Sequence, residues 1–109
     1  MIDWARVNEL QVEIGADDFA EVVEMFLDEA NEVAARMDSN MADSEIEAAL
    51  HFLKGSALNL GFNKLADLCQ DGEKRAAGGQ AAMVDLTDII STFHASAKAF
   101  AEMAKNHAA

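Results

Sequence analysis

The chain has 109 residues, the common size of one domain, and we predict a single domain that spans residues 1–109. Twenty acidic residues against eight basic ones give a formal net charge of -12 at pH 7. Such a charge repels nucleic acid and anionic lipid at long range, so we expect no nucleic-acid or membrane partner.

The sequence also disfavours export, membrane insertion and disulfide bonding. No run approaches the roughly 18 apolar residues of a membrane span, and the first residues lack the basic and apolar regions of an export signal. The single cysteine, Cys69, cannot close an internal disulfide, and we predict a small core residue there. We therefore expect a cytoplasmic protein, and we expect it to be a monomer.

The composition favours helix over strand, because 51% of the residues are hydrophobic while proline and tyrosine are absent. Glycine and polar clusters divide the chain into five segments, within which apolar residues recur at steps of three and four. This spacing is typical of a helix with one face buried in a bundle.

Five helices are predicted in chain order. Residues 3–14 form a short helix with Asp3 as its N-cap, which we expect to cover one end of the fold. Residues 17–37, 43–60, 63–77 and 80–105 form four longer helices with short connections. We therefore predict an all-α fold, an antiparallel up-and-down four-helix bundle with a short additional N-terminal helix. The residues expected to face inward are Val7, Leu10, Ile14, Phe19, Val23, Phe26, Ala30, Val33, Met37, Ile46, Leu50, Leu53, Ala57, Leu60, Leu65, Leu68 or Cys69, Ala76, Leu86, Ile90, Phe93, Ala97, Phe100 and Ala104.

The outward face of the predicted helix 43–60 differs from an ordinary solvated face. At roughly 100° per residue, His51 lies about 140° from the apolar seam of this helix and Gly55 about 180° from it. Both residues therefore point outward. The other residues on or beside this face are Glu47, Ala48, Lys54 and Leu58.

Gly55 needs an explanation, because a glycine in the middle of a helix costs about 1 kcal/mol relative to alanine. Close approach by another molecule is one explanation, since the missing side chain clears the surface beside His51. Leu58 and Ala48 would then supply apolar area for docking. A tolerated glycine and a scattered leucine would explain the same pattern without any partner.

His51 is a candidate nucleophile, since a neutral imidazole can form a covalent bond to a transferred group. Lys54 lies one turn away and could offset the charge of a phosphoryl group on that ring. Exposed histidines on helices are also common without any function, so the helix geometry alone leaves both interpretations open.

Residues 51–61, with the sequence HFLKGSALNLG, resemble the phosphorylation-site helix of histidine phosphotransfer (HPt) domains. The resemblance covers essentially the whole chain. Its further positions are Asp3, Leu10, Gly15, Asp17 or Asp18, Phe19, Phe26, Leu65, Cys69 and Glu73.

The resemblance implies a phosphorelay intermediate, a phosphocarrier rather than an enzyme with a kinase domain. Nε2 of His51 would take a phosphoryl group from the aspartate of one response-regulator receiver domain and pass it to the aspartate of another. A receiver within a hybrid sensor kinase is one such partner. No cofactor of the chain itself is implied, because Mg²⁺ would come with the receiver.

The resemblance also implies roles by position. Lys54 would lie near the phosphoryl group, and Gly55 would provide clearance for docking. Glu73 would accept a hydrogen bond from Nδ1 of His51, which fixes the tautomer and leaves Nε2 free. The predicted partner-binding residues are Glu47, Ala48, Lys54, Gly55 and Leu58.

Two positions depart from the pattern of the family. Gly72 stands where the family usually has a large apolar residue, and Phe62 stands where a small residue commonly follows the glycine. These differences predict a fourth helix that is looser or displaced, with Glu73 less well positioned beside His51.

Two other functions remain open, and a third is disfavoured. A helical phosphatase acting on the aspartyl phosphate of a receiver would use Gln70 or Asn59 to position water. An adaptor would bind a receiver without transferring phosphate. A metal or haem site is disfavoured, because its candidate ligands lack a paired spacing such as Glu-x-x-His, and we predict no metal. Those candidate ligands are His51, His94, His107 and Cys69.

Overall fold

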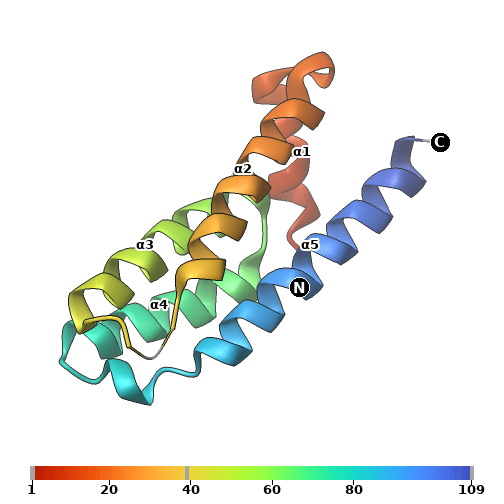
Figure 1. The fold of residues 1–109 in the computed structure, drawn as a ribbon. Coiled ribbons are helices and arrows are strands. Elements are labelled where there is room, and N and C mark those ends of the chain that lie inside the picture. The colour runs from red at the N-terminus through yellow and green to blue at the C-terminus, as the bar shows by residue number, and fades with distance from the viewer. Residues whose placement is uncertain (1, 39, 109) are drawn as a thin grey trace.

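The computed structural model describes residues 2–38 and 40–108, with side chains described as far as residue 102. The helices are α1 (Trp4–Ile14), α2 (Ala16–Arg36), α3 (Asp43–Leu60), α4 (Asn63–Ala77) and α5 (Leu86–Ala108), and a 3-10 turn, η1 (Ala81–Met83), precedes α5. The described ranges contain no strand. The predicted all-α fold is confirmed, since α2 to α5 form an antiparallel bundle to which the short α1 is added (Figure 1).

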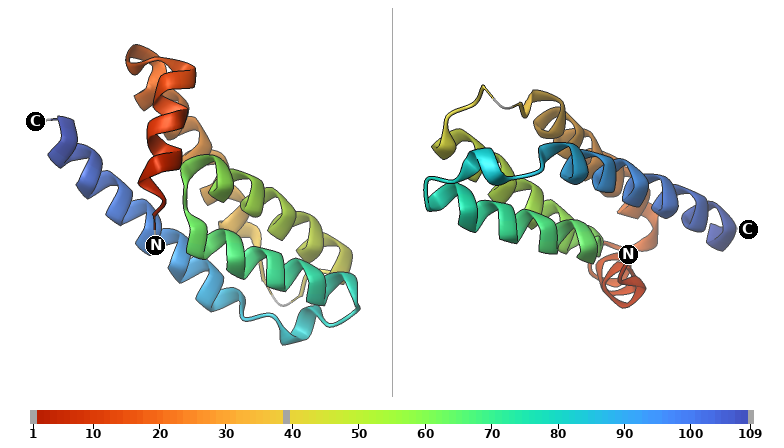
Figure 2. Two further views of the ribbon diagram at one scale, coloured as in Figure 1. Left: turned by 180° about the vertical axis from the view of Figure 1, so that it is seen from behind. Right: turned by 90° about the horizontal axis from the view of Figure 1, so that it is seen from below.

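The helices pack unequally. α3 and α4 form a hairpin, and they contact each other more extensively than any other pair of elements. α2 packs on α3, α5 packs on α4, and α1 contacts both α2 and α3 (Figure 2). The molecule is elongated, with extents of 46 × 22 × 21 Å. The helices of the described ranges include no candidate for a membrane span.

Local hydrogen bonds explain where the helices begin. The side chain of Asp3 accepts a hydrogen bond from the backbone N–H of Arg6 at 3.3 Å, so the predicted N-cap of α1 is confirmed. Glu45 accepts from the backbone N–H of Ala42 at 3.2 Å and satisfies a donor at the start of α3. α3 and α4 have the predicted bounds.

The last predicted helix is wrong at its start. We expected it to begin at residue 80, but the chain first makes η1, and α5 begins at Leu86. Asp85 explains this start, because its side chain accepts a hydrogen bond from the backbone N–H of Asp88 at 2.9 Å. A cap at this position starts a new helix there.

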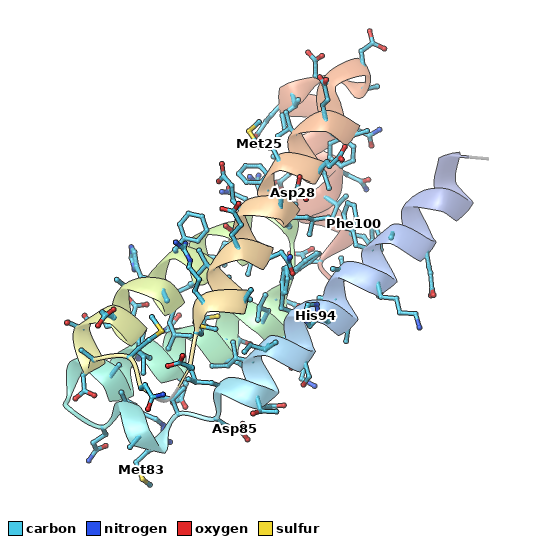
Figure 3. The ribbon with its side chains drawn as sticks, in the orientation of Figure 1. Met25, Asp28, Met83, Asp85, His94 and Phe100 are labelled. Atoms are coloured by element: carbon cyan, nitrogen blue, oxygen red, sulfur yellow. The ribbon has the colours of Figure 1, made fainter. Side chains whose placement is uncertain are left out.

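The core confirms the predicted seam of α3, whose five members are all buried. In α5 the buried face lies about one residue away from the prediction: Ile89 and Ser96 are buried, whereas Ile90 and Ala97 are half-buried. Phe93 and Phe100 are buried as predicted, and the side chain of Phe100 extends from α5 toward α1, where it stacks on Trp4 (Figure 3). Ala104 lies outside the described side chains.

The turn between α3 and α4 anchors the N-terminus. Gly61 has a φ of +75°, and its carbonyl accepts a hydrogen bond from the backbone N–H of Asp3 at 2.6 Å. A side chain at Gly61 would collide with the Asp3 carbonyl oxygen, so this close approach requires glycine. Phe62 is fully buried and meets the ring of Phe100 edge to face, with centroids 5.9 Å apart.

The expected loosening of the fourth helix is wrong. Gly72 is buried, and a Cβ at this position would lie 2.9 Å from Leu50 Cδ1 and 3.1 Å from Val84 Cγ1. Neighbouring side chains therefore occupy the space that a large residue at position 72 would fill. The glycine allows α4 to lie close to Leu50 of α3, and the buried ring of Phe62 is part of the core.

Candidate functional site

His51 lies on the outer face of α3, in the direction predicted from the helical spacing. Its side chain is 69% exposed. Gly55, four residues later on the same face, is exposed, and a Cβ added there would meet no atom within 4 Å. The surface beside the imidazole is therefore open to an approaching molecule.

The structure brings the three predicted catalytic residues together. Glu73 reaches across from α4, and its Oε1 lies 2.7 Å from His51 Nδ1. The other carboxylate oxygen of Glu73, Oε2, lies 2.8 Å from Lys54 Nζ. The glutamate thus contacts the histidine and the lysine at once, and the ion pair with Lys54 is a contact that the sequence did not predict.

The surroundings of Glu73 favour its ionised form. The pKa of Glu73 lies below its ordinary value, chiefly because Lys54 binds the carboxylate, with a further contribution from the contact with His51. Burial opposes this shift. Only 19% of the side chain is exposed, so solvent screens these interactions less than at an open surface. The site therefore holds a carboxylate anion against Nδ1.

Cys69 lies in the core behind this group. Burial raises the pKa of its thiol to about 12, and the negative charge of Glu73 adds to the effect while Lys54 opposes it. A thiol with such a pKa is protonated at neutral pH and is a poor nucleophile. The prediction of a core cysteine is confirmed by its complete burial.

The predicted partner-binding residues fall into two groups. Ala48, Gly55 and Leu58 are exposed around His51, and Leu58 has 57% of its surface accessible. Glu47 is instead half-buried and lines a hollow of about 370 Å³ toward α4. The other residues of that hollow are Lys54, Gln70, Glu73, Lys74 and Ala77.

Phe52 is a surface residue of this face that the sequence reasoning missed. It is 40% exposed, which is unusual for a phenylalanine in a helix that buries a full apolar seam. Its helical position, about 100° from His51, puts it on the side away from Lys54. In the sequence, the feature that could have indicated this exposed residue is the position of an aromatic side chain outside the i, i+3, i+4 apolar seam.

Of the candidate residues for other functions, Gln70 is exposed and lines the hollow with Lys54 and Glu73, whereas Asn59 and His94 lie elsewhere. The side-chain oxygen of Asn59 accepts a hydrogen bond from Arg6 Nη2 at 3.4 Å, which ties it to α1. His94 is exposed on α5 beside the ring of Phe93, and His107 lies outside the described side chains. Within the described part of the chain, no three His, Cys, Asp or Glu residues gather as a metal site would require.

Comparison with protein families decides what kind of domain carries this arrangement. Residues 21–106 match the family model described as Hpt domain. The chain belongs to the Hpt family. Hpt domains are phosphotransfer modules of phosphorelay signalling, and they interact with receiver domains. The matched residues include all of α3 and α4, and therefore the whole His51 site. Neither the curated proteins nor the solved structures gave a match.

Proposed function

We propose that His51 is the phosphorylated residue of this Hpt domain, and that it takes a phosphoryl group from the aspartate of one receiver domain and passes it to the aspartate of another. The contact of Glu73 with Nδ1 supports this assignment most directly. A carboxylate that accepts from Nδ1–H keeps the lone pair of the ring on Nε2, where a nucleophile is needed.

The transfer to His51 exchanges a P–O bond for an N–P bond. The Nε2 lone pair attacks the phosphorus of the aspartyl phosphate, an N–P bond forms, and the bond from phosphorus to the aspartate oxygen breaks. The receiver recovers a free carboxylate, and the ring proton stays on Nδ1, hydrogen-bonded to Glu73. The second transfer reverses these events on another receiver aspartate. Mg²⁺, which the receiver would bring, would neutralise charge on the phosphoryl group.

The surface around His51 supports the proposal that a receiver docks on this face of α3. Ala48, Phe52 and Leu58 offer exposed apolar area, and Gly55 leaves the path to the imidazole open. Lys54 supplies positive charge beside the incoming phosphoryl group, and its present partner, Glu73, keeps it at the site.

The deciding experiment compares two histidine variants with a phosphorylated receiver as donor. We expect His51→Gln to abolish labelling and His94→Gln, which removes an exposed histidine on α5, to leave it unchanged. The label should be lost in mild acid, as expected for a phosphoramidate. Acid-stable label, or label on His94, would contradict the assignment. Stable binding of a receiver without any label would show an adaptor, and release of free phosphate without histidine labelling would show a phosphatase.

A further inference from the structure

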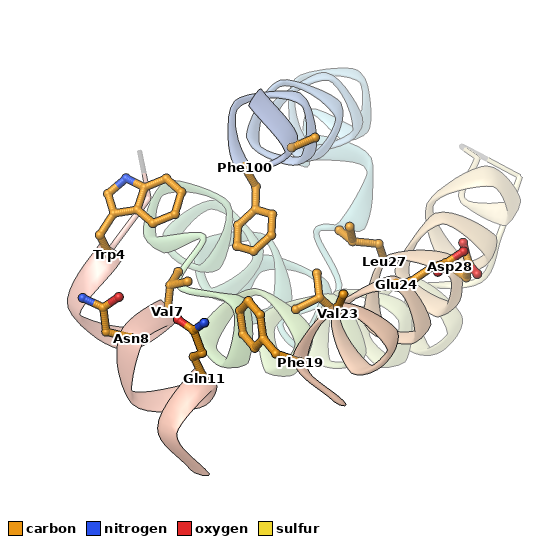
Figure 4. A pocket seen from close by; sticks show the side chains of 12 residues that line it. Trp4, Val7, Asn8, Gln11, Phe19, Val23, Glu24, Leu27, Asp28 and Phe100 are labelled. Carbon is orange, nitrogen blue, oxygen red and sulfur yellow. The ribbon is translucent and has the colours of Figure 1, made fainter. Parts of the chain in front are cut away.

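A groove lies between α1, α2 and the C-terminal half of α5, and it shares no residue with the His51 site. Its volume is about 750 Å³. Figure 4 shows the side chains that line it. The apolar part of its lining comes from all three helices. These residues are Trp4, Val7, Phe19, Ala20, Val23, Leu27, Phe100 and Ala101.

The floor of the groove is held in place by aromatic contacts. Phe100 stacks on Trp4, with ring centroids 5.8 Å apart, and it also meets the buried ring of Phe62. Phe19 and Leu27 on the α2 wall are only half-buried. The groove therefore exposes apolar surface to water on a preformed scaffold, and an apolar occupant would remove that surface from water.

The polar rim of the groove carries negative charge. Glu24 and Asp28 lie one turn apart on α2, so both carboxylates belong to the same edge, and both are exposed. Neither forms an ion pair with another described residue. The opposite edge, on α1, carries the neutral amides Asn8 and Gln11, and no described residue in the lining is basic.

The dimensions indicate a small molecule as occupant. The α2 wall runs from Phe19 to Asp28, which at about 1.5 Å per residue is about 14 Å long. A partner helix of that length would have fewer than three turns. The volume, by contrast, falls in the range of roughly 300–1,000 Å³ typical of sites for small organic ligands.

We propose that this groove binds an amphipathic organic cation, with an apolar or aromatic body against Phe19 and Phe100 and a positively charged group at Glu24 and Asp28. The ring faces of the lining favour a cation as well. A second copy of this chain is a poor occupant, because its net charge of -12 would be repelled. This inference does not depend on the function of His51.

The test uses two probes of the same shape and opposite charge, tetraphenylphosphonium and tetraphenylborate. Trp4 is the only tryptophan of the chain and lines the groove, so its fluorescence reports directly on occupancy. We expect tetraphenylphosphonium to shift the Trp4 emission saturably at one site, with calorimetry giving the same affinity. Tetraphenylborate should bind at least about tenfold more weakly.

Two double variants distinguish binding in the groove from general electrostatic attraction of a cation to an acidic protein. Glu24→Gln with Asp28→Asn removes the rim charge, and we expect roughly tenfold weaker binding. The control, Glu21→Gln with Glu32→Gln, removes the same charge from exposed positions of α2 outside the groove and should have little effect.

A third double variant fills the groove without changing the charge of the protein. Ala20→Leu with Ala101→Leu adds bulk from both walls at exposed positions and should abolish the saturable shift while the variant still unfolds cooperatively on heating. Equal binding of both probes, an equal loss in the control variant, or binding that survives the filled groove would overturn the proposal. A basic amphipathic peptide that shifts Trp4 where tetraphenylphosphonium does not would also overturn it.

Discussion

Lys54 and Glu73 form an ion pair across α3 and α4, with Nζ 2.8 Å from Oε2. The same carboxylate contacts His51 Nδ1 through its other oxygen, so Glu73 links the lysine to the histidine. If His51 is phosphorylated as proposed, the phosphoryl oxygens would compete with Glu73 for the lysine. The two residues therefore need to be tested separately.

Glu73→Ala should slow phosphotransfer while leaving the bundle folded. The variant loses the acceptor that orients the imidazole, but it removes only one side chain at the edge of the core, so the stability cost should be small. Single-turnover transfer from a phosphorylated receiver measures the effect. Asp71→Ala is the matched control, because it removes an exposed carboxylate of α4 that pairs with Arg75. Equal rates for the parent and Glu73→Ala would contradict an orienting role.

Lys54→Ala should reduce the transfer rate, or the lifetime of phosphorylated His51, more than it reduces fold stability. Its charge is useful chiefly when the phosphoryl group is present, and the ion pair alone contributes about 1 kcal/mol or less. Lys54→Arg should retain part of the activity, and Lys64→Ala, at an exposed position of α4, should have none of these effects. Transfer kinetics of Lys54→Ala that match those of the parent across a range of salt concentrations would refute this.

The lowered pKa of Glu73 predicts a pH dependence of stability. Because the folded-state pKa lies below the ordinary value of 4.5, the ionised carboxylate stabilises the fold above about pH 4.5, and this contribution disappears as the pH falls through the folded pKa. Glu73→Gln cannot ionise and lacks the contribution at every pH. The stability difference between the parent and Glu73→Gln, measured by denaturant unfolding, should therefore be largest near neutral pH and shrink below pH 4.5. A difference that does not change with pH would contradict the assignment.

The sequence predicted α3 well because its apolar residues repeat in a single stripe. Ile46, Leu50, Leu53, Ala57 and Leu60 leave one orientation that buries them all, and this orientation sets the outward direction of His51 and Gly55. The contact between Glu73 and His51 was expected from the family resemblance, not from spacing within a helix, because the two residues lie on different helices.

What the sequence did not predict depends on contacts between helices. The stripe of α5 is ambiguous, since Ile89 and Ile90 are both apolar, and the choice between them follows from how α5 packs after Asp85 has capped it. The ion pair of Lys54 with Glu73 depends on how closely α4 approaches α3. Leu50 of α3 packs closely on Gly72 of α4, a contact that helical periodicity does not reveal.

Two glycines in the middle of helices should respond oppositely to the same substitution. Gly55→Ala adds a methyl group in open space and should stabilise the fold by up to about 1 kcal/mol. Gly72→Ala gains the same helix propensity, but its Cβ would lie 2.9 Å from Leu50 Cδ1 and 3.1 Å from Val84 Cγ1, so the core must shift. Overpacking of this kind costs about 1–3 kcal/mol, and we expect net destabilisation by thermal unfolding. A gain in stability at both positions would show that Leu50 moves aside freely.

Gly55→Gln separates docking from folding, because we expect two effects of opposite sign from one substitution. The fold should gain up to about 1 kcal/mol, since a good helix former replaces an exposed glycine that has no neighbour within 4 Å of its missing side chain. Transfer should suffer, since a long side chain one turn from His51 would stand between the imidazole and the receiver aspartate. Misplacement of the reacting groups by about 1 Å can cost on the order of a hundredfold in rate.

The comparison with Gly55→Ala makes this test of docking specific. Both variants should be more stable than the parent, but the methyl group of alanine is too short to reach an incoming receiver aspartate, so Gly55→Ala should transfer phosphate much faster than Gly55→Gln. Thermal unfolding and transfer from a saturating receiver are measured on the same preparations. If Gly55→Gln transfers phosphate as fast as the parent, the receiver docks elsewhere and the clearance at Gly55 has no role in access to His51.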